Sequence, residues 1–108
     1  MTSRTPESRC ERATALAAQV AEIVHGGGRK YAFSYLTLLD IRDILADPEA
    51  EAESALAEAA QRFDRLYAAP RDGFSEFFVC NDDRKQMVAD NKRFKELVNE
   101  LHSLLHDS

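Results

Sequence analysis

The chain has 108 residues, which is enough for one domain with a modest core and too few for two. Its hydrophobic content of 44% supports such a core, and its long Ala- and Glu-rich stretches favour helix over strand. The net charge of −5 argues against broad, non-specific binding to nucleic acid, which depends on Lys and Arg side chains that neutralise phosphates. We expect a short N-terminal tail, residues 1–5, and a single domain over residues 6–106.

The first predicted helix covers residues 6–25. Thr5 is a suitable N-cap, and Pro6 suits the first helical turn. Apolar residues recur seven positions apart and so form one face at helical spacing: Ala13 and Val20, Leu16 and Ile23, Ala17 and Val24. The run Gly26-Gly27-Gly28 ends the helix in this interpretation, because glycine takes the left-handed conformation at little steric cost.

The second element gives two conflicting signals. Tyr31, Phe33 and Tyr35 alternate with small residues, which is typical of a strand. Further along, Leu38, Ile41 and Leu45 follow helical spacing. We predict a helix over residues 34–46 and keep an extended segment over residues 31–36 as the alternative.

The third predicted helix starts at Asp47-Pro48-Glu49, where an aspartate can cap the helix and proline suits its first position. It continues to about Ala69, and Pro70-Arg71-Asp72-Gly73 then breaks the chain. Its apolar seam has spacings of four and three residues: Ala52, Leu56, Ala59, Phe63, Leu66.

The last part of the chain contains a short apolar segment and the longest predicted helix. Residues 74–80 are too few to separate helix from strand, and a short helix is slightly favoured. The long helix starts at Asn81 or Asp82 and runs to about His106. Its apolar stripe includes residues seven apart: Met87, Phe94, Leu101.

These elements predict an all-α fold, a small antiparallel helical bundle of four to five helices. Seams with spacings of three and four are buried when helices pack nearly antiparallel, and the short connections favour the same arrangement. The alternative is an α+β domain with short strands over residues 31–36 and 74–80.

Asp90 is the most informative polar residue because it projects into the apolar stripe of the last helix, with Asn91 beside the stripe. A desolvated carboxylate without a partner is costly. Three interpretations stay open. The helix overhangs the bundle and leaves Asp90 in water, or Asp90 pairs with an arginine such as Arg42 or Arg62, or Asp90 is a catalytic carboxylate.

The turn Gly26-Gly27-Gly28-Arg29-Lys30 resembles an anion-binding loop, since backbone N–H groups and two cations can hold a phosphate. Its spacing fits neither the P-loop nor the dinucleotide-binding motif. The simpler interpretation is a helix cap followed by a flexible turn.

Two histidines and two cysteines are weak metal-site candidates. His102 and His106 are four residues apart and share a face, but zinc needs at least three protein ligands. Cys10 and Cys80 are interpreted as small core residues in a reducing compartment. We expect no metal and no cofactor.

The aromatic residues are the better functional clue, because they fall in the two segments whose secondary structure is ambiguous. Exposed aromatic patches usually mark partner surfaces. The aromatic residues concerned are Tyr31, Phe33, Tyr35, Phe74, Phe77 and Phe78. We predict that they bind a partner together with Asp90 and Asn91.

The leading hypothesis is a non-enzymatic protein–protein interaction module, a small adaptor, regulator or inhibitor. Its partner is another protein or a second copy bound through the long last helix, which makes a homodimer. One alternative is a small ligand-binding bundle or enzyme that uses residues 26–30 for an anion or Asp90 as an acid or base. A second is an accessory subunit of a complex that handles nucleic acid, although direct nucleic-acid binding is not expected. No stretch approaches the ~20 apolar residues of a membrane span, and we expect a cytoplasmic protein without membrane contact.

Overall fold

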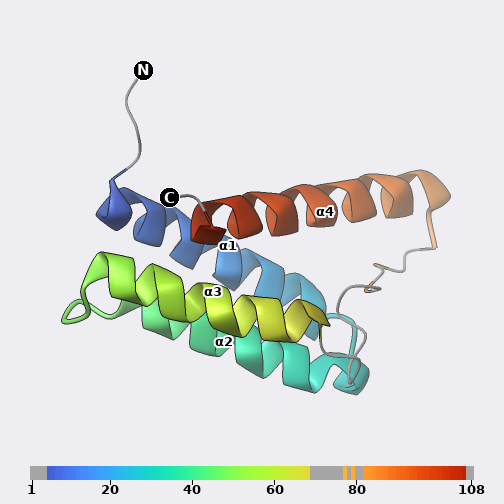
Figure 1. Cartoon of the computed structure of the whole chain (residues 1–108). Coiled ribbons are helices and arrows are strands. Elements are labelled where there is room, and N and C mark those ends of the chain that lie inside the picture. Colours follow the sequence, from blue (N-terminus) through green and yellow to red (C-terminus); the bar gives the residue numbers. More distant parts are fainter. Residues whose placement is uncertain (1–4, 69–76, 78, 80–81, 107–108) are drawn as a thin grey trace.

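Over residues 5–68, 77, 79 and 82–106, which the computed structural model describes, the chain forms a small all-α bundle. Its long helices are α1 (Pro6–His25), α2 (Ala32–Ala46), α3 (Ala52–Ala68) and α4 (Arg84–His106), and a short 3-10 helix, η1 (Arg29–Tyr31), precedes α2. Successive long helices run in opposite directions, and α1 contacts each of the other three (Figure 1). None of the described helices carries an apolar stretch long enough to cross a membrane.

The bounds of α1 are those predicted from its caps. The Ser8 N–H donates to Thr5 Oγ1 at 3.1 Å, so the threonine side chain satisfies one of the unpaired N–H groups of the first turn. The helix ends at His25 with Gly26 as its C-cap, and Gly28, with a φ of 89°, turns the chain into η1. Only glycine takes that left-handed conformation without steric cost.

The extended alternative for residues 31–36 is wrong, because Tyr31 closes η1 and α2 begins at Ala32. The buried residues of α2 explain this: Ser34, Leu38, Ile41 and Leu45 are spaced four, three and four apart. The helical period therefore includes Ser34, which is fully buried, and the alternation of aromatic residues around it is incidental. The predicted helix of residues 34–46 is confirmed and starts two residues earlier.

The predicted start of α3 at Asp47-Pro48-Glu49 is wrong. The Asp47 carboxylate accepts from the Glu49 N–H at 2.9 Å, and its carbonyl accepts from the Ala50 N–H at 3.4 Å, so these residues form a turn. Since α2 ends at Ala46, the chain needs this turn to reverse direction before α3 begins at Ala52. The predicted seam of α3 is buried, apart from a partly exposed Ala52.

The helix α4 begins at Arg84, after Asp83, whose carboxylate accepts from the N–H groups of Lys85 at 3.0 Å and Gln86 at 3.3 Å. Its buried residues all lie in the C-terminal two thirds: Phe94, Leu97, Val98, Leu101, Leu104, Leu105. The N-terminal end extends past the ends of α1 and α3 (Figure 1). Of the ambiguous segment 74–80, only Phe77 and Val79 are described, and neither is in a helix or strand; Phe74 and Phe78 lie outside the described residues.

Two arginines hold the C-terminal half of α4 against α1. The Arg9 guanidinium donates to the Leu104 carbonyl at 3.0 and 2.6 Å, which satisfies a carbonyl in the last turn of α4. Arg12 binds Glu100 through two hydrogen bonds of 2.8 and 3.1 Å, and these raise the pKa of Arg12. The register of α4 on α1 is therefore set at its C-terminal end, while its N-terminal half diverges and leaves space beside α1.

Candidate functional site

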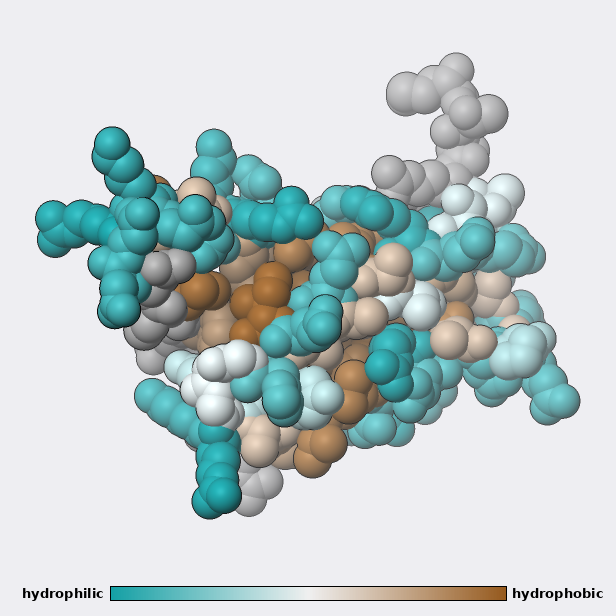
Figure 2. Space-filling model, turned by 180° about the vertical axis from the view of Figure 1, so that it is seen from behind, coloured by the Kyte–Doolittle hydropathy of each residue, from teal (hydrophilic) through white to brown (hydrophobic). Residues whose placement is uncertain are grey.

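A groove of about 620 Å³ lies between the C-terminal end of α1 and the N-terminal half of α4. Seen from behind, the molecule has apolar surface in a hollow bordered by hydrophilic side chains (Figure 2). The lining residues come from α1, the following turn, the segment before α4, and α4 itself: Glu22, Ile23, Gly26, Gly27, Tyr31, Phe77, Val79, Asp90, Arg93.

The floor of the groove is an aromatic cluster that packs over the end of α1. The Phe77 ring lies edge-on to Tyr31, with ring centroids 4.7 Å apart, and 4.8 Å from the ring of Phe94. A Cβ atom at Gly27 would lie 2.7 Å from Cε1 of Phe77 and 2.9 Å from Cδ2 of Tyr31. Glycine is therefore needed at position 27 because two rings occupy the space of a side chain.

One wall of the groove is held by Asn91. Its Oδ1 accepts from the Val79 N–H at 2.7 Å, and its Nδ2 donates to the Val79 carbonyl at 2.9 Å and to the Met87 carbonyl at 2.8 Å. The amide thus pairs with both backbone polar groups of Val79, as a neighbouring strand would. These bonds occupy the side chain that the sequence marked as partner-binding, and they make Asn91 a positioning residue for the wall.

The rim carries Glu22, Asp90 and Arg93. Asp90 is partly exposed and accepts a hydrogen bond from Gln86 Nε2 at 2.7 Å. The buried pair with Arg42 or Arg62 is not formed, since Arg42 binds Asp43 at 2.9 Å and Arg62 lies 3.6 Å from Glu58. Of the interpretations offered for Asp90, the structure excludes the pairs with Arg42 and Arg62 and agrees with an N-terminal half of α4 that overhangs the bundle.

The structure brings together five of the residues singled out in the sequence, since Gly26, Gly27, Tyr31, Phe77 and Asp90 all line the groove. Asn91 supports the wall through Val79, and the remaining described candidates lie outside the groove lining. On α2, Phe33 is 42% exposed near the 59% exposed Leu36, and Tyr35 packs on His25 with ring centroids 4.5 Å apart.

Four residues of the groove were missed. Ile23 belongs to the apolar face assigned to the core, and the charged residues Glu22 and Arg93 fit an ordinary solvated helix face. Val79 falls in the ambiguous segment. Nothing in the sequence indicated that α1 and α4 separate at this level.

The glycine turn has few free donors for an anion. The N–H groups of Gly26, Gly27 and Gly28 donate to the carbonyls of Glu22, Val24 and His25 at 3.3, 2.9 and 3.2 Å. An anion at this turn would depend on the exposed side chains of Arg29 and Lys30, and the anion-binding hypothesis keeps only that support.

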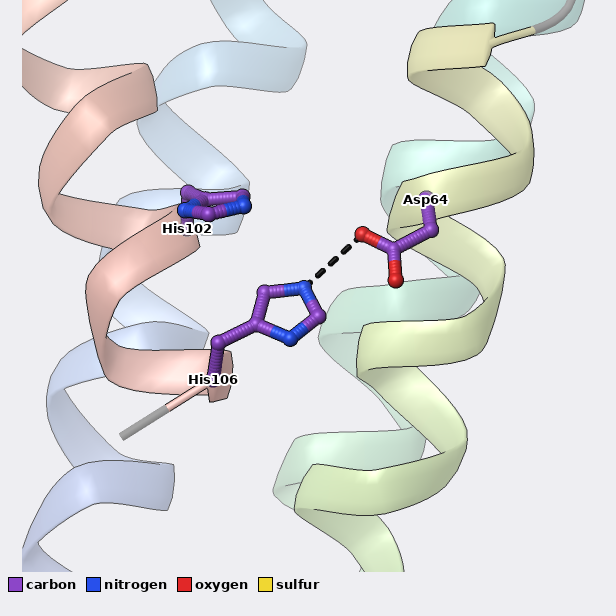
Figure 3. A group of neighbouring side chains, drawn as sticks. All are labelled: Asp64, His102 and His106. Atoms are coloured by element: carbon purple, nitrogen blue, oxygen red, sulfur yellow. Dashed lines mark hydrogen bonds and ion pairs between the residues drawn. The ribbon is translucent and has the colours of Figure 1, made fainter. Parts of the chain in front are cut away.

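A second cluster contains the histidine pair noted in the sequence, His102 and His106 of α4, together with Asp64 of α3 (Figure 3). Their possible ligand atoms all lie within 4.8 Å of one another. Asp64 is 42 residues before His106, so only the packing of α3 against α4 brings the third group to the histidine pair.

Cys10 is a core residue, as predicted. It is 7% exposed, and burial raises the pKa of its thiol, which keeps it protonated and a weak nucleophile. Cys80 lies outside the described residues.

The described lining of the groove offers two carboxylates, a guanidinium and a phenol, and none of these residues is a serine, cysteine or histidine. That set can pair with charges and bury apolar groups. No family model, curated protein or solved structure matches the chain.

Proposed function

We propose that the protein is a non-enzymatic protein–protein interaction module that receives apolar side chains of a partner protein's helix in the α1–α4 groove. The observation that carries this proposal is the groove itself, with an aromatic floor and a charged rim. Helix-in-groove recognition uses this combination: apolar side chains of the partner fill the floor, and charges at the rim select the partner and its orientation.

The charges favour a foreign partner over a second copy. Among the rim charges that the structure describes, Glu22 and Asp90 are carboxylates and Arg93 is a cation, and the chain as a whole has a net charge of −5. A second copy would bring the same negative charge, whereas a helix with apolar anchors beside Lys or Arg complements both floor and rim. The energy of such a contact is concentrated in the anchors that reach the desolvated floor.

Site-specific photocrosslinking in the source cell tests the proposal. A photoreactive amino acid replaces Arg93, which is exposed and lines the groove, or Lys95 as a control. Lys95 lies two residues further along α4 and therefore about 200° away around the helix. We expect one crosslinked protein that is specific to position 93. Equal capture at both positions would contradict groove binding, and a product made of two copies of the chain would mean self-association.

The captured protein, once purified, allows a quantitative test. Asp90→Arg should weaken its binding about tenfold by reversing a rim charge, while Asp40→Arg, the same reversal on the outer face of α2, should change it less than about twofold. Equal effects of the two variants would show that only the net charge matters.

A small-ligand-binding bundle is the second candidate, and the size of the groove favours it. A volume of about 620 Å³ lies within the roughly 300–1,000 Å³ of pockets that hold small molecules. Changes in the amide chemical shifts of Gly27 and Asp90 on NMR titration with a fragment library would support this candidate. Unchanged amide shifts would contradict it and favour a protein partner.

A further inference from the structure

Three side chains that can bind a metal meet on the surface where α3 packs against α4. His102 and His106 are one helical turn apart on α4, and Asp64 faces them from α3 (Figure 3). The carboxylate Oδ1 of Asp64 lies 2.8 Å from Nε2 of His106, and the rings of the two histidines have centroids 4.5 Å apart. We propose that these residues bind one divalent transition-metal ion of the class of Zn²⁺, which links α3 to α4.

The distances are close to those of a coordinated ion. Around a tetrahedral ion with bonds of about 2.0–2.2 Å, the ligand atoms lie roughly 3.3–3.6 Å apart. The possible ligand atoms here are all within 4.8 Å of one another, and the closest pair is 2.8 Å apart. Small side-chain rotations bring all three to bonding distance. They cost little, because the side chains of Asp64 and His106 are 53% and 36% exposed.

The backbone positions of the ligands are fixed by the core beneath them. Phe63, the neighbour of Asp64, is 1% exposed and anchors α3 at this level. The His102 ring packs near Phe63 with centroids 6.0 Å apart, which restricts the orientation of the imidazole. On α4, Leu101, Leu104 and Leu105 are buried around the histidines. An ion therefore meets ligands whose spacing the fold already sets.

The chemistry of the three groups selects the class of ion. Two imidazoles and one carboxylate suit Zn²⁺, Co²⁺, Ni²⁺ or Cu²⁺, whereas Mg²⁺ and Ca²⁺ require oxygen ligands. The end of α4 also favours a cation, because His106 is its last residue and the carbonyl groups of a last turn carry partial negative charge. Three protein ligands leave at least one position for water.

Zinc binding to the full chain tests the site. Isothermal titration with ZnCl₂ should give one site per chain, and Co²⁺ should give the visible absorption of a low-coordinate complex. An ion that binds only the folded chain raises the melting temperature, by roughly 10 °C at a hundredfold excess over Kd. Mg²⁺ should produce no shift.

Matched variants assign the binding to the cluster. His106→Gln and Asp64→Asn should each weaken zinc binding at least tenfold, while His25→Gln, the same change at the exposed end of α1, should leave it unchanged. Circular dichroism in the absence of metal checks that each variant is folded. If His106→Gln does not fold, the zinc affinity of Asp64→Asn tests the site. Absence of zinc binding by the parent protein, or equal binding by His25→Gln and both cluster variants, would overturn the proposal.

Discussion

Replacing Gly27 by alanine places a methyl group where two aromatic rings already lie. The new Cβ would be 2.7 Å from Phe77 and 2.9 Å from Tyr31, well inside the ~3.5–4.0 Å of favourable carbon contacts. Phe77 cannot retreat freely, because its ring also packs on Phe94. Overpacking costs about 1–3 kcal/mol, offset by about 0.4–1 kcal/mol from the stiffer unfolded chain. We expect the free energy of unfolding to fall by about 1–2 kcal/mol.

The two neighbouring glycines provide controls with different physics. Gly26 has a helical conformation, with φ −64° and ψ −17°, and a Cβ there would lie 3.3 Å from the Ile23 carbonyl oxygen. Gly26→Ala should therefore change stability by less than about 0.5 kcal/mol. Gly28 has a φ of 89° and no atom within 4 Å of a Cβ, so Gly28→Ala should cost about 1–2 kcal/mol by backbone strain alone.

Urea denaturation followed by far-UV circular dichroism measures the three stabilities, and the near-UV spectrum separates the two causes. Gly27→Ala should alter the near-UV signal of the aromatic residues, because the rings are displaced, whereas Gly28→Ala should leave it unchanged. A Gly27→Ala variant as stable as Gly26→Ala would refute the close packing of Phe77 and Tyr31 over α1, and with it the floor of the groove.

Three further variants or measurements examine other parts of the structure. Asn91→Ala should lower the free energy of unfolding by about 1–2 kcal/mol in urea denaturation, because both backbone groups of Val79 lose their partner. Asp90→Leu should leave the protein folded, with a melting temperature within a few degrees of the parent, since Asp90 is partly exposed; loss of the fold would show that it belongs to a required network. The raised pKa of Cys10 means that the folded chain keeps this proton to higher pH than the unfolded chain, so its contribution to stability falls as pH rises through the thiol range. Alkylation of Cys10, followed by mass spectrometry of its peptide, should be at least tenfold slower in the native protein than in urea.

The parts of the fold that depend on local signals could be predicted from the sequence. The bounds of α1 follow from Thr5, Pro6 and the three glycines, because caps and periodicity act within a few residues. The seams of α3 and α4 follow from spacings of three and four for the same reason.

The errors arose where one residue pattern serves two structures. An aspartate before a proline can cap a helix or close a turn, and Asp47 closes a turn because α2 ends immediately before it. Alternating aromatic residues indicated a strand at 31–36, yet the buried Ser34 continues the period of the three apolar residues after it. In both places the packing of α2 decides between structures that are locally similar.

The candidate sites depend on contacts that no local pattern specifies. Gly27 and Asp90 were each marked from the sequence, but their placement in one groove depends on α4 running antiparallel to α1 and diverging from it. Asp64 is one of many acidic residues on helix surfaces, and only the register of α3 against α4 distinguishes it.

The groove and the histidine cluster lie at opposite ends of α4, and this makes the two proposals independent. From Asp90 to His106 the helix rises about 24 Å, at 1.5 Å per residue. Substitutions separated by more than about 7–10 Å that share no partner have additive effects. Asp90→Arg should therefore leave the affinity for zinc unchanged. In the absence of metal, His106→Gln should leave photocrosslinking of the partner protein from position 93 unchanged. A loss of zinc binding in Asp90→Arg would mean that α4 shifts as a rigid rod against α1 and α3. The contacts of Arg9 with Leu104 and of Arg12 with Glu100 oppose such a shift, because they fix the helix close to the histidines.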